Sequence, residues 1–451
     1  MSHSDERFAK PAPATPAAAA ARVVPLCGAA GLLLFTAAFF LGDPGIGGWD
    51  QNFYFAYAGA LAEHGDLDLA PAYQALVERG ADPAVFDPSK RTATGQVYNY
   101  FPIGHPLTHA WALLPGRLAS LLAGQGGGAF SPLAQYFYCL SCVAGGLLGL
   151  AAMRRIVARW FGDAAAALAL LSLFGASMLG YYLFILPAMS HSTTLLVLGA
   201  ALWLAVPILD RREEARSWRY FALGLLVGWG VAVRLQDVGL GWLLAAAAWA
   251  AWRSGAPVAK AAKRAGLAVL GGFLGFLPQL LHWRWRDGAW LPSGYSDYAH
   301  FDFSDPHFVE VLFHARHGLF HWHPLLLAAA AGFVWWMATA GRPLPRRLGA
   351  FLALHAATIW ILAAGFSIWW FGDSFGSRPF LSALPLFWLG LAALWSRALE
   401  RPRAAWALGA AIAALTLWNA LLMVAFHLAW ISRSGPLEPA AVLRAWVDRA
   451  G

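Results

Sequence analysis

The sequence predicts one all-α, polytopic membrane domain with about 11 transmembrane helices, and composition is the first observation behind that prediction. Apolar residues make up 59% of the 451 residues, charged residues make up only 12%, and the mean hydropathy is +0.54. A soluble chain needs roughly a quarter of its residues charged to cover its surface. The composition therefore excludes soluble globular, disordered and disulfide-stapled classes, and it predicts an outer surface that faces lipid.

The second observation is a series of apolar runs, most of them long enough to cross a bilayer, which takes about 20 helical residues. The run at 238–252 is short for a span. Residues 101–122 carry three prolines, so we expect a broken element that dips into the membrane from the outer face, with a twelve-span protein as the alternative. The predicted spans are 23–41, 132–152, 163–186, 190–209, 219–234, 238–252, 265–285, 317–338, 348–368, 379–396 and 404–430.

Charge placement is the third observation, and it predicts the sidedness of the domain. Five basic clusters between alternate runs hold 17 of the 32 Lys and Arg residues, and the positive-inside rule places them in the cytoplasm. The connections 43–100 and 286–316 carry eight and five carboxylates against three and two cations, so we expect them outside. The predicted organisation is a disordered cytoplasmic tail (1–21), one transmembrane domain (22–430) and a short outer C-terminal tail (431–451).

Cysteine and charge statistics exclude two further classes. Cys27, Cys139 and Cys142 all lie in apolar runs, so no disulfide framework is expected. The net charge of +8 is spread over the basic clusters, and we expect membrane lipids as partners and no nucleic acid.

The first outer loop is predicted to contain two short helices. The first follows Asp50, and its aromatic face is expected to lie in lipid at the membrane interface. Gly65 is expected to end it, and a second helix should run from Pro71 to Arg79 before Gly80. Asp50 is either a helix N-cap, which its position alone favours, or a general base at the membrane surface. The residues expected on the lipid-facing side are Phe53, Tyr54, Tyr57 and Leu61.

The string GGWDQNFYFAYAGALAEHGDL (47–67) resembles the opening outer loop of GT-C membrane glycosyltransferases, in the protein-mannosyltransferase and aminoarabinose-transferase branch (glycosyltransferase family 39-like, bacterial). Asp50 matches the Asp of that family, Gln51 replaces its usual Glu, and Tyr54 fits its interfacial helix. Three further stretches are similar to bacterial members: YNYFPIGHPL (98–107), VRLQDVGLGWLL (233–244), and the pair ARHGLFHWHPLLL and WWFGDSFGSRPFLSALPLFWLGLAALW.

This resemblance implies an inverting glycosyltransferase with a polyprenyl-phosphate-linked sugar donor. The acceptor would be a lipid, glycan or protein at the periplasmic face of a bacterial inner membrane. Such chemistry needs a base for the acceptor hydroxyl, for which Asp50 is the candidate, and cations for the departing phosphate. The cation candidates are Arg234, Arg316 and Arg378, and the other substrate-binding candidates are Tyr54, Tyr100, His191, His317, Trp370 and Asp373.

Structural interpretations of the same residues stay open. Arg234 could pair with Asp237, and Arg378 with Asp373, as ordinary ion pairs. Six histidines between 300 and 323 include pairs at helical spacing, but interfacial hydrogen bonding explains them better than a metal does, so no metal or other cofactor is predicted. The rival functions are a transporter or flippase of lipid-linked sugars, which should show internal symmetry, and a non-catalytic membrane scaffold.

Overall fold

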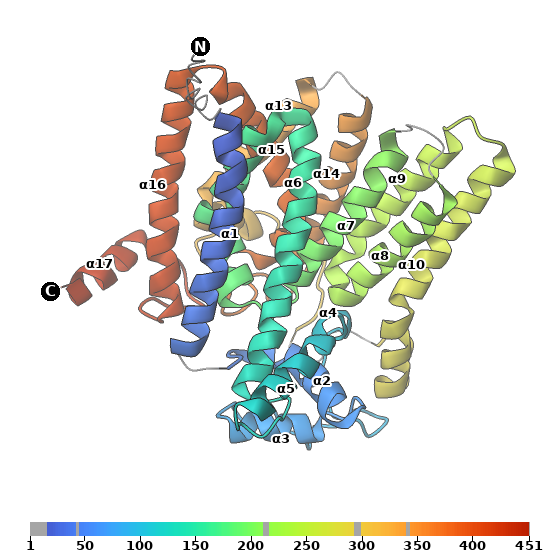
Figure 1. Cartoon of the computed structure of the whole chain (residues 1–451), viewed down its shortest axis with the longest axis vertical. Helices are drawn as coiled ribbons and strands as arrows, with labels where there is room; N and C mark the ends of the chain where they lie inside the picture. The colour runs from blue at the N-terminus through green and yellow to red at the C-terminus, as the bar shows by residue number, and fades with distance from the viewer. Residues whose placement is uncertain (1–15, 42–44, 211–215, 293–298, 340–342, 451) are drawn as a thin grey trace, which may run out of the picture.

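The computed structural model describes residues 16–41, 45–210, 216–292, 299–339 and 343–450, which fold into helices (Figure 1). These ranges contain no β-strand, only isolated bridges between Arg91 and Val97 and between Phe301 and Phe366. The predicted all-α class is confirmed. The main helices are α1 (Pro16–Leu41), α2 (Trp49–His64), α3 (Ala70–Glu78), α4 (Gly104–His109), α5 (Leu113–Leu122), α6 (Pro132–Ala176), α7 (His191–Asp210), α8 (Ser217–Val233), α9 (Gly241–Trp252), α10 (Val258–Asp287), α13 (Pro324–Thr339), α14 (Pro343–Ala364), α15 (Leu384–Leu399), α16 (Pro402–His427) and α17 (Pro439–Ala450).

Six of the described helical segments are long and apolar enough to cross a membrane, and three shorter ones are also apolar. They indicate a multi-pass membrane protein, as the composition predicted. These helices do not establish how many times the chain crosses the membrane, so eleven spans stays a prediction. The six are Pro132–Ala176, His191–Asp210, Val258–Asp287, Arg346–Ala364, Arg378–Leu399 and Pro402–His427; the three are Gly28–Leu41, Ser217–Val233 and Pro324–Thr339.

Several predicted boundaries were wrong. α6 bends at Gly162, whose φ of 78° lies in the left-handed region. Its second arm ends at Ala176 instead of residue 186, and a separate turn of π-helix follows at Tyr181–Ile185. α9 has only 12 residues, which is short for a crossing. α1 already begins at Pro16, inside the predicted tail, while residues 1–15 lie outside the described ranges.

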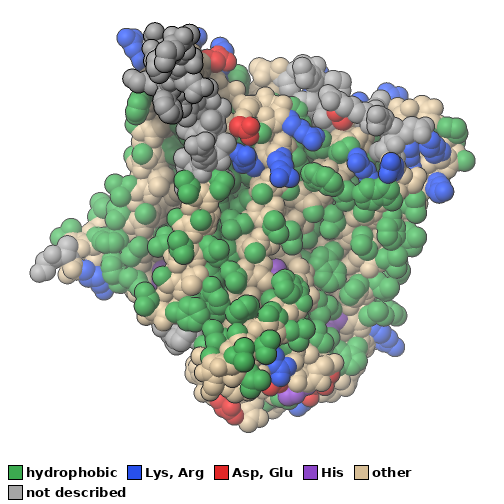
Figure 2. All heavy atoms as spheres, in the orientation of Figure 1, with side chains coloured by type: hydrophobic (Ala, Val, Ile, Leu, Met, Phe, Trp, Pro, Cys, Tyr) green, Lys and Arg blue, Asp and Glu red, His purple; other side chains and the backbone are tan. Residues whose placement is uncertain are grey.

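The bundle has two chemically different ends. Helices α2 to α5 gather at one end, which we call the loop end, and the connections that hold the basic clusters lie at the opposite end (Figure 1). Figure 2 shows Lys and Arg side chains concentrated at that opposite end, above a broad hydrophobic band. Arg211, Arg212 and Arg342 lie outside the described residues. The separation of charge follows the predicted pattern of loops.

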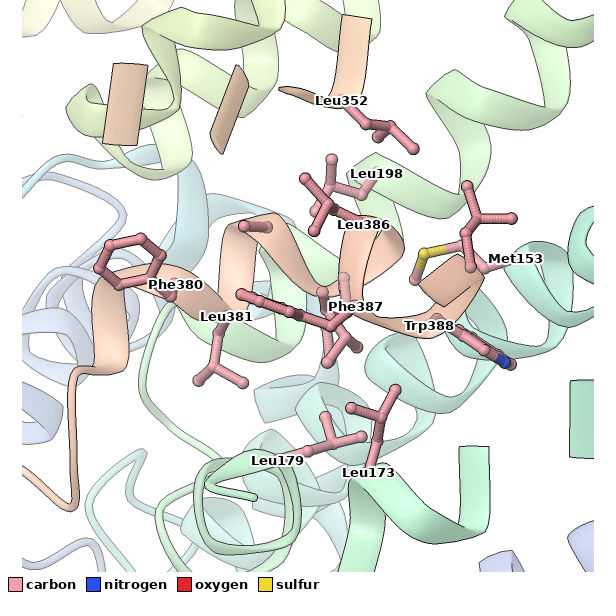
Figure 3. Packing of buried hydrophobic residues seen from close by; sticks show 14 of the residues in the cluster. Met153, Leu173, Leu179, Leu198, Leu352, Phe380, Leu381, Leu386, Phe387 and Trp388 are labelled. Carbon is pink, nitrogen blue, oxygen red and sulfur yellow. The ribbon is translucent and has the colours of Figure 1, made fainter. Parts of the chain in front are cut away.

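The core is built around α15 (Figure 3). Trp388 is fully buried, and its indole N–H donates to the Ala166 carbonyl oxygen at 2.9 Å. Trp395 donates to the Ser172 hydroxyl at 3.0 Å. These two hydrogen bonds connect α15 to the second arm of α6 at two points along α15. The 3₁₀ turn Arg378–Ala383 leads directly into α15, and its Leu381 is also buried. Arg378 therefore stands on a rigid element.

Helices α8 and α10 are packed through glycines. Each carries a Gly-x-x-x-Gly pattern, which lets two helix backbones approach closely in a membrane. A Cβ added at Gly228 would overlap the Gly272 carbonyl oxygen, and one added at Gly275 would overlap the Leu225 carbonyl oxygen. Gly266, on the same helix α10, has no atom within 4 Å of such a Cβ.

The substitution Gly275→Val is therefore expected to destabilise the folded protein by about 1–3 kcal/mol, because the α8–α10 contact would have to open. Thermal unfolding in detergent would report this as a lower Tm. Gly266→Val is the matched control, since it makes the same change of residue type within the same helix without the clash. Equal Tm values for the two variants would show that the close approach contributes nothing to stability.

The loop end contains both predicted outer helices. α2 ends at Gly65 with a φ of 77°, and Gly80, at 93°, follows α3, as predicted. The expectation that the aromatic face of α2 lies in lipid was wrong, because Phe53, Tyr54 and Tyr57 are at most 6% exposed. Tyr73 of α3 packs on Phe53, and the segment after α3 folds back over α2 and adds Phe86 and Phe101.

The Pro-rich segment 101–122 is broken as predicted. It forms α4, one 3₁₀ turn at Ala110–Ala112 and α5. Leu114, Leu118 and Leu122 of α5 are more than half exposed, as expected for a helix that meets lipid. In the C-terminal tail, α17 forms a further helix that projects from the bundle (Figure 1).

Candidate functional site

Asp50 and Arg378 form an ion pair at the loop end of the bundle. Arg378 Nη1 lies 2.5 Å from Asp50 Oδ2, and both side chains are about a quarter exposed. The N-cap of α2 is Gly48, with a φ of 79°, so Asp50 stands inside the first turn and is not the cap that its position suggested. The alternative pair of Arg378 with Asp373 was also wrong, since the partner of Arg378 comes from α2.

Arg234 lies at the end of α8 and is 9% exposed. Its Nη1 lies 2.6 Å from His191 Nδ1, 3.1 Å from His191 Nε2 and 3.4 Å from the Ser190 hydroxyl. With the Gln236 amide turned so that its oxygen faces the guanidinium, that oxygen accepts a further hydrogen bond. Because arginine can only donate, His191 accepts from it through a ring nitrogen. Tyr54 of α2 donates to the same Ser190 hydroxyl at 3.0 Å.

Tyr182 joins these two groups into one cluster. Its ring packs 4.6 Å from the His191 ring, and its hydroxyl bonds the Ser374 hydroxyl at 3.1 Å and accepts from the Phe375 amide at 2.9 Å. Both charges of the Asp50–Arg378 pair act electrostatically on the Tyr182 hydroxyl, and Arg378 also acts on His191. The loop end thus brings together residues from α2, the start of α7, the end of α8 and the turn before α15.

The charges of this cluster do not balance. Asp50 is occupied by Arg378, and the partners of Arg234 are the uncharged groups of Ser190, His191 and Gln236. No carboxylate within the described ranges lies at ion-pair distance from Arg234, so the Arg234–Asp237 pair was wrong; Asp237 instead accepts from Thr194 at 3.1 Å. A buried guanidinium without an ion-pair partner is costly at a membrane boundary, which makes this cluster a candidate anion site.

A second wall of the cluster comes from the loop that leads to Arg378. The Arg316 guanidinium stacks 3.7 Å over the Trp370 ring and donates to the Ser434 carbonyl at 2.6 Å. His317 donates from Nδ1 to the Trp370 carbonyl at 2.7 Å, and Arg378 acts on it electrostatically. Asp373 lies on the same loop and is exposed.

His317 is held in a strained backbone conformation, with a φ of 62°, and Phe371, next to its hydrogen-bond partner, has a φ of 61°. Residues 314–318 form a turn, so the helical spacing noted among these histidines does not apply. Burial lowers the pKa of His317 to about 4, so the ring is neutral at neutral pH. Its Nε2 is buried and makes no hydrogen bond within the described chain.

Tyr100 is a candidate that the structure places elsewhere. Its ring packs on Phe53 at 5.4 Å and on Phe101 at 4.5 Å, inside the aromatic core of the outer loop. Conversely, sequence reasoning assigned no role to Tyr182 or Gln236. Tyr182 stands eight residues before Ser190, and Gln236 stands in the string VRLQD, but neither position carries a motif that requires it.

Fold and site together define a helical, multi-pass membrane protein with an acid–arginine pair and an uncompensated arginine at one end. Comparisons of the chain with protein-family models, curated proteins and solved structures return no match. The chemistry of the cluster is therefore the basis for any functional assignment.

Proposed function

We propose that this protein is an inverting glycosyltransferase that moves a sugar from a polyprenyl-phosphate donor to an acceptor at the outer face of a bacterial inner membrane. The observation that supports it most is the uncompensated guanidinium of Arg234 beside the Asp50–Arg378 pair. A phosphate of the donor would supply the missing negative charge, and guanidinium groups bind phosphate oxygens well.

In the proposed reaction, the acceptor hydroxyl gives its proton to Asp50 as its oxygen attacks the anomeric carbon. The ion pair engages Oδ2 of Asp50, so Oδ1 is the oxygen available for that proton. The bond between the anomeric carbon and the phosphate oxygen breaks, and its electron pair leaves with the polyprenyl phosphate. Attack opposite to the leaving group inverts the anomeric carbon, and Arg234 neutralises the departing phosphate.

The position of the cluster supports surface chemistry. The basic connections lie at the opposite end of the bundle, and the positive-inside rule would place that end in the cytoplasm (Figure 2). The candidate residues would then face the periplasm, where lipid-linked sugars serve as donors after translocation. A transporter would need its polar groups near the middle of the bilayer.

The experiment is transfer by purified protein in lipid nanodiscs, supplied with polyprenyl-phosphate sugars and with lipid, glycan and peptide acceptors. Mass spectrometry should detect a glycosylated acceptor and free polyprenyl phosphate, and a deletion strain should lose one glycan from its surface profile. An unchanged glycan profile, with transfer of intact lipid-linked sugar across proteoliposome membranes, would establish the flippase instead.

A further inference from the structure

Two histidines and a cysteine converge in a buried cluster behind the candidate site. His105 and His109 lie one turn apart on α4, and Cys142 comes from α6; all three are at most 2% exposed. Their ligand atoms lie within 4.8 Å of one another. Thr193 of α7 places its hydroxyl between the two rings, 2.7 Å from His105 Nδ1 and 2.8 Å from His109 Nε2.

We propose that His105, His109 and Cys142 bind one Cu(I) ion, with the Thr193 hydroxyl as a weak fourth ligand. This set of two imidazoles, one thiolate and a distant oxygen is one that proteins use for copper. The cluster borders the candidate anion site, since the Tyr54 ring packs 5.0 Å from the His105 ring, but it shares no ligand with that site, and the inference does not depend on the proposed glycosyl transfer.

The orientation of both rings supports this site. A ligating histidine is normally held by a hydrogen bond from its other ring nitrogen. His105 donates from Nε2 to the Ala188 carbonyl at 2.8 Å, and His109 Nδ1 bonds the Ser141 hydroxyl at 2.9 Å. The remaining nitrogen of each ring therefore points to the shared position beside Thr193.

The geometry needs only a small adjustment to hold an ion. The Ser141 hydroxyl donates to the Tyr138 carbonyl, so His109 donates to Ser141 from Nδ1, and the facing nitrogens of both rings are acceptors. Without metal, the Thr193 hydroxyl can donate its single proton to only one of them. Ligand atoms around a tetrahedral or trigonal ion with N and S ligands lie roughly 3.5 Å apart. The present contacts to Thr193 are shorter than this, and no two of the three ligand atoms are more than 4.8 Å apart, so side-chain movements on the order of 1 Å would create the site.

Charge favours a monovalent over a divalent ion. When the ion binds, the Cys142 thiol releases its proton to solvent, and the thiolate brings one negative charge among neutral imidazoles. Cu(I) makes the complex neutral, whereas Zn²⁺ would leave a buried positive charge. Arg234 already acts electrostatically on His105, and an added cation there would be repelled. Soft thiolate ligation also selects Cu(I).

We expect the bound ion to restrict the movement of the segment that carries Ser190 and His191 of the candidate site. Ala188 accepts from His105 and donates its amide to the Gln51 side chain at 3.0 Å, and Ser190 and His191 follow two residues later. An ion held between α4, α6 and α7 would fix this segment against α2.

The test is metal titration of the purified full-length protein under reducing conditions, with Cu(I) and Zn²⁺ in parallel and competition against a chromophoric Cu(I) chelator. Wild type should retain one equivalent of copper after desalting, with a higher Tm, and at least tenfold less zinc. Cys142→Ser should lose the bound copper. Cys139→Ser is the matched control, because Cys139 is equally buried one turn earlier on α6 and is not part of the cluster.

Absence of retained copper in the wild type would overturn the proposal without reference to any variant. Retention of zinc in preference to copper would overturn the charge argument, and full copper retention by Cys142→Ser would remove the cysteine from the site. Should Cys142→Ser fail to fold, His109→Gln provides the second variant, and its loss of copper is equally required.

Discussion

Asp50→Asn is expected to abolish glycosyl transfer while the protein stays folded. The amide has the size of the carboxylate and can still accept from Arg378, but it cannot take the proton of the acceptor hydroxyl. Loss of a general base lowers the rate by about 10²- to 10⁴-fold. The measurement is kcat for transfer in nanodiscs, together with Tm and gel filtration.

The control for this variant is Asp66→Asn. Asp66 is exposed, lies just beyond α2 in the same loop, and only accepts from the Asp68 amide within its own turn. It should keep wild-type activity. If Asp50→Asn also turns over within a few fold of wild type, Asp50 is not the base, and the scaffold interpretation of the protein gains weight.

Arg378→Met is expected to reduce transfer by a similar factor, with Arg378→Lys intermediate. Methionine removes the charge, so Asp50 loses its partner and its orientation. Lysine keeps the charge but cannot reproduce the planar fork of donors that the guanidinium offers. Arg397 provides matched controls, because it stands near the opposite end of α15, is exposed and pairs with Glu400; Arg397→Met and Arg397→Lys should be silent.

The double variant Asp50→Asn/Arg378→Met separates two roles of Arg378. If Arg378 acts only by holding Asp50, the double variant should be no slower than Asp50→Asn alone. If Arg378 also binds the donor phosphate, KM for the donor should rise further in the double variant. Wild-type kinetics in Arg378→Met would contradict both roles.

Local patterns were sufficient for several elements of the fold. Low charge and repeated apolar runs predicted a helical membrane protein, and prolines predicted the break of residues 101–122. The ends of α2 and α3 followed from Gly65 and Gly80, because glycine adopts a positive φ without strain. These features depend on residues close in sequence.

Features that depend on distant residues were predicted less well. The aromatic face of α2 has the pattern of a lipid-facing helix, but Phe86 and Phe101 cover it. The two local ion pairs expected for Arg234 and Arg378 also failed, since proximity in sequence says little about which carboxylate a folded chain brings nearest. His105 and His109 were readable as a helical pair, but Cys142 joins them only through the packing of α4 against α6.

The sequence by itself determined the class of the protein, the ends that carry opposite charge patterns, and Asp50 as the most informative residue, because these follow from composition and local order. Only the tertiary structure decided that Asp50 meets Arg378 across 328 positions of the chain. It also decided that Arg234 is left among neutral partners. The physical reason is that ion pairing and burial are set by which helices pack together, and that packing is a property of the whole bundle.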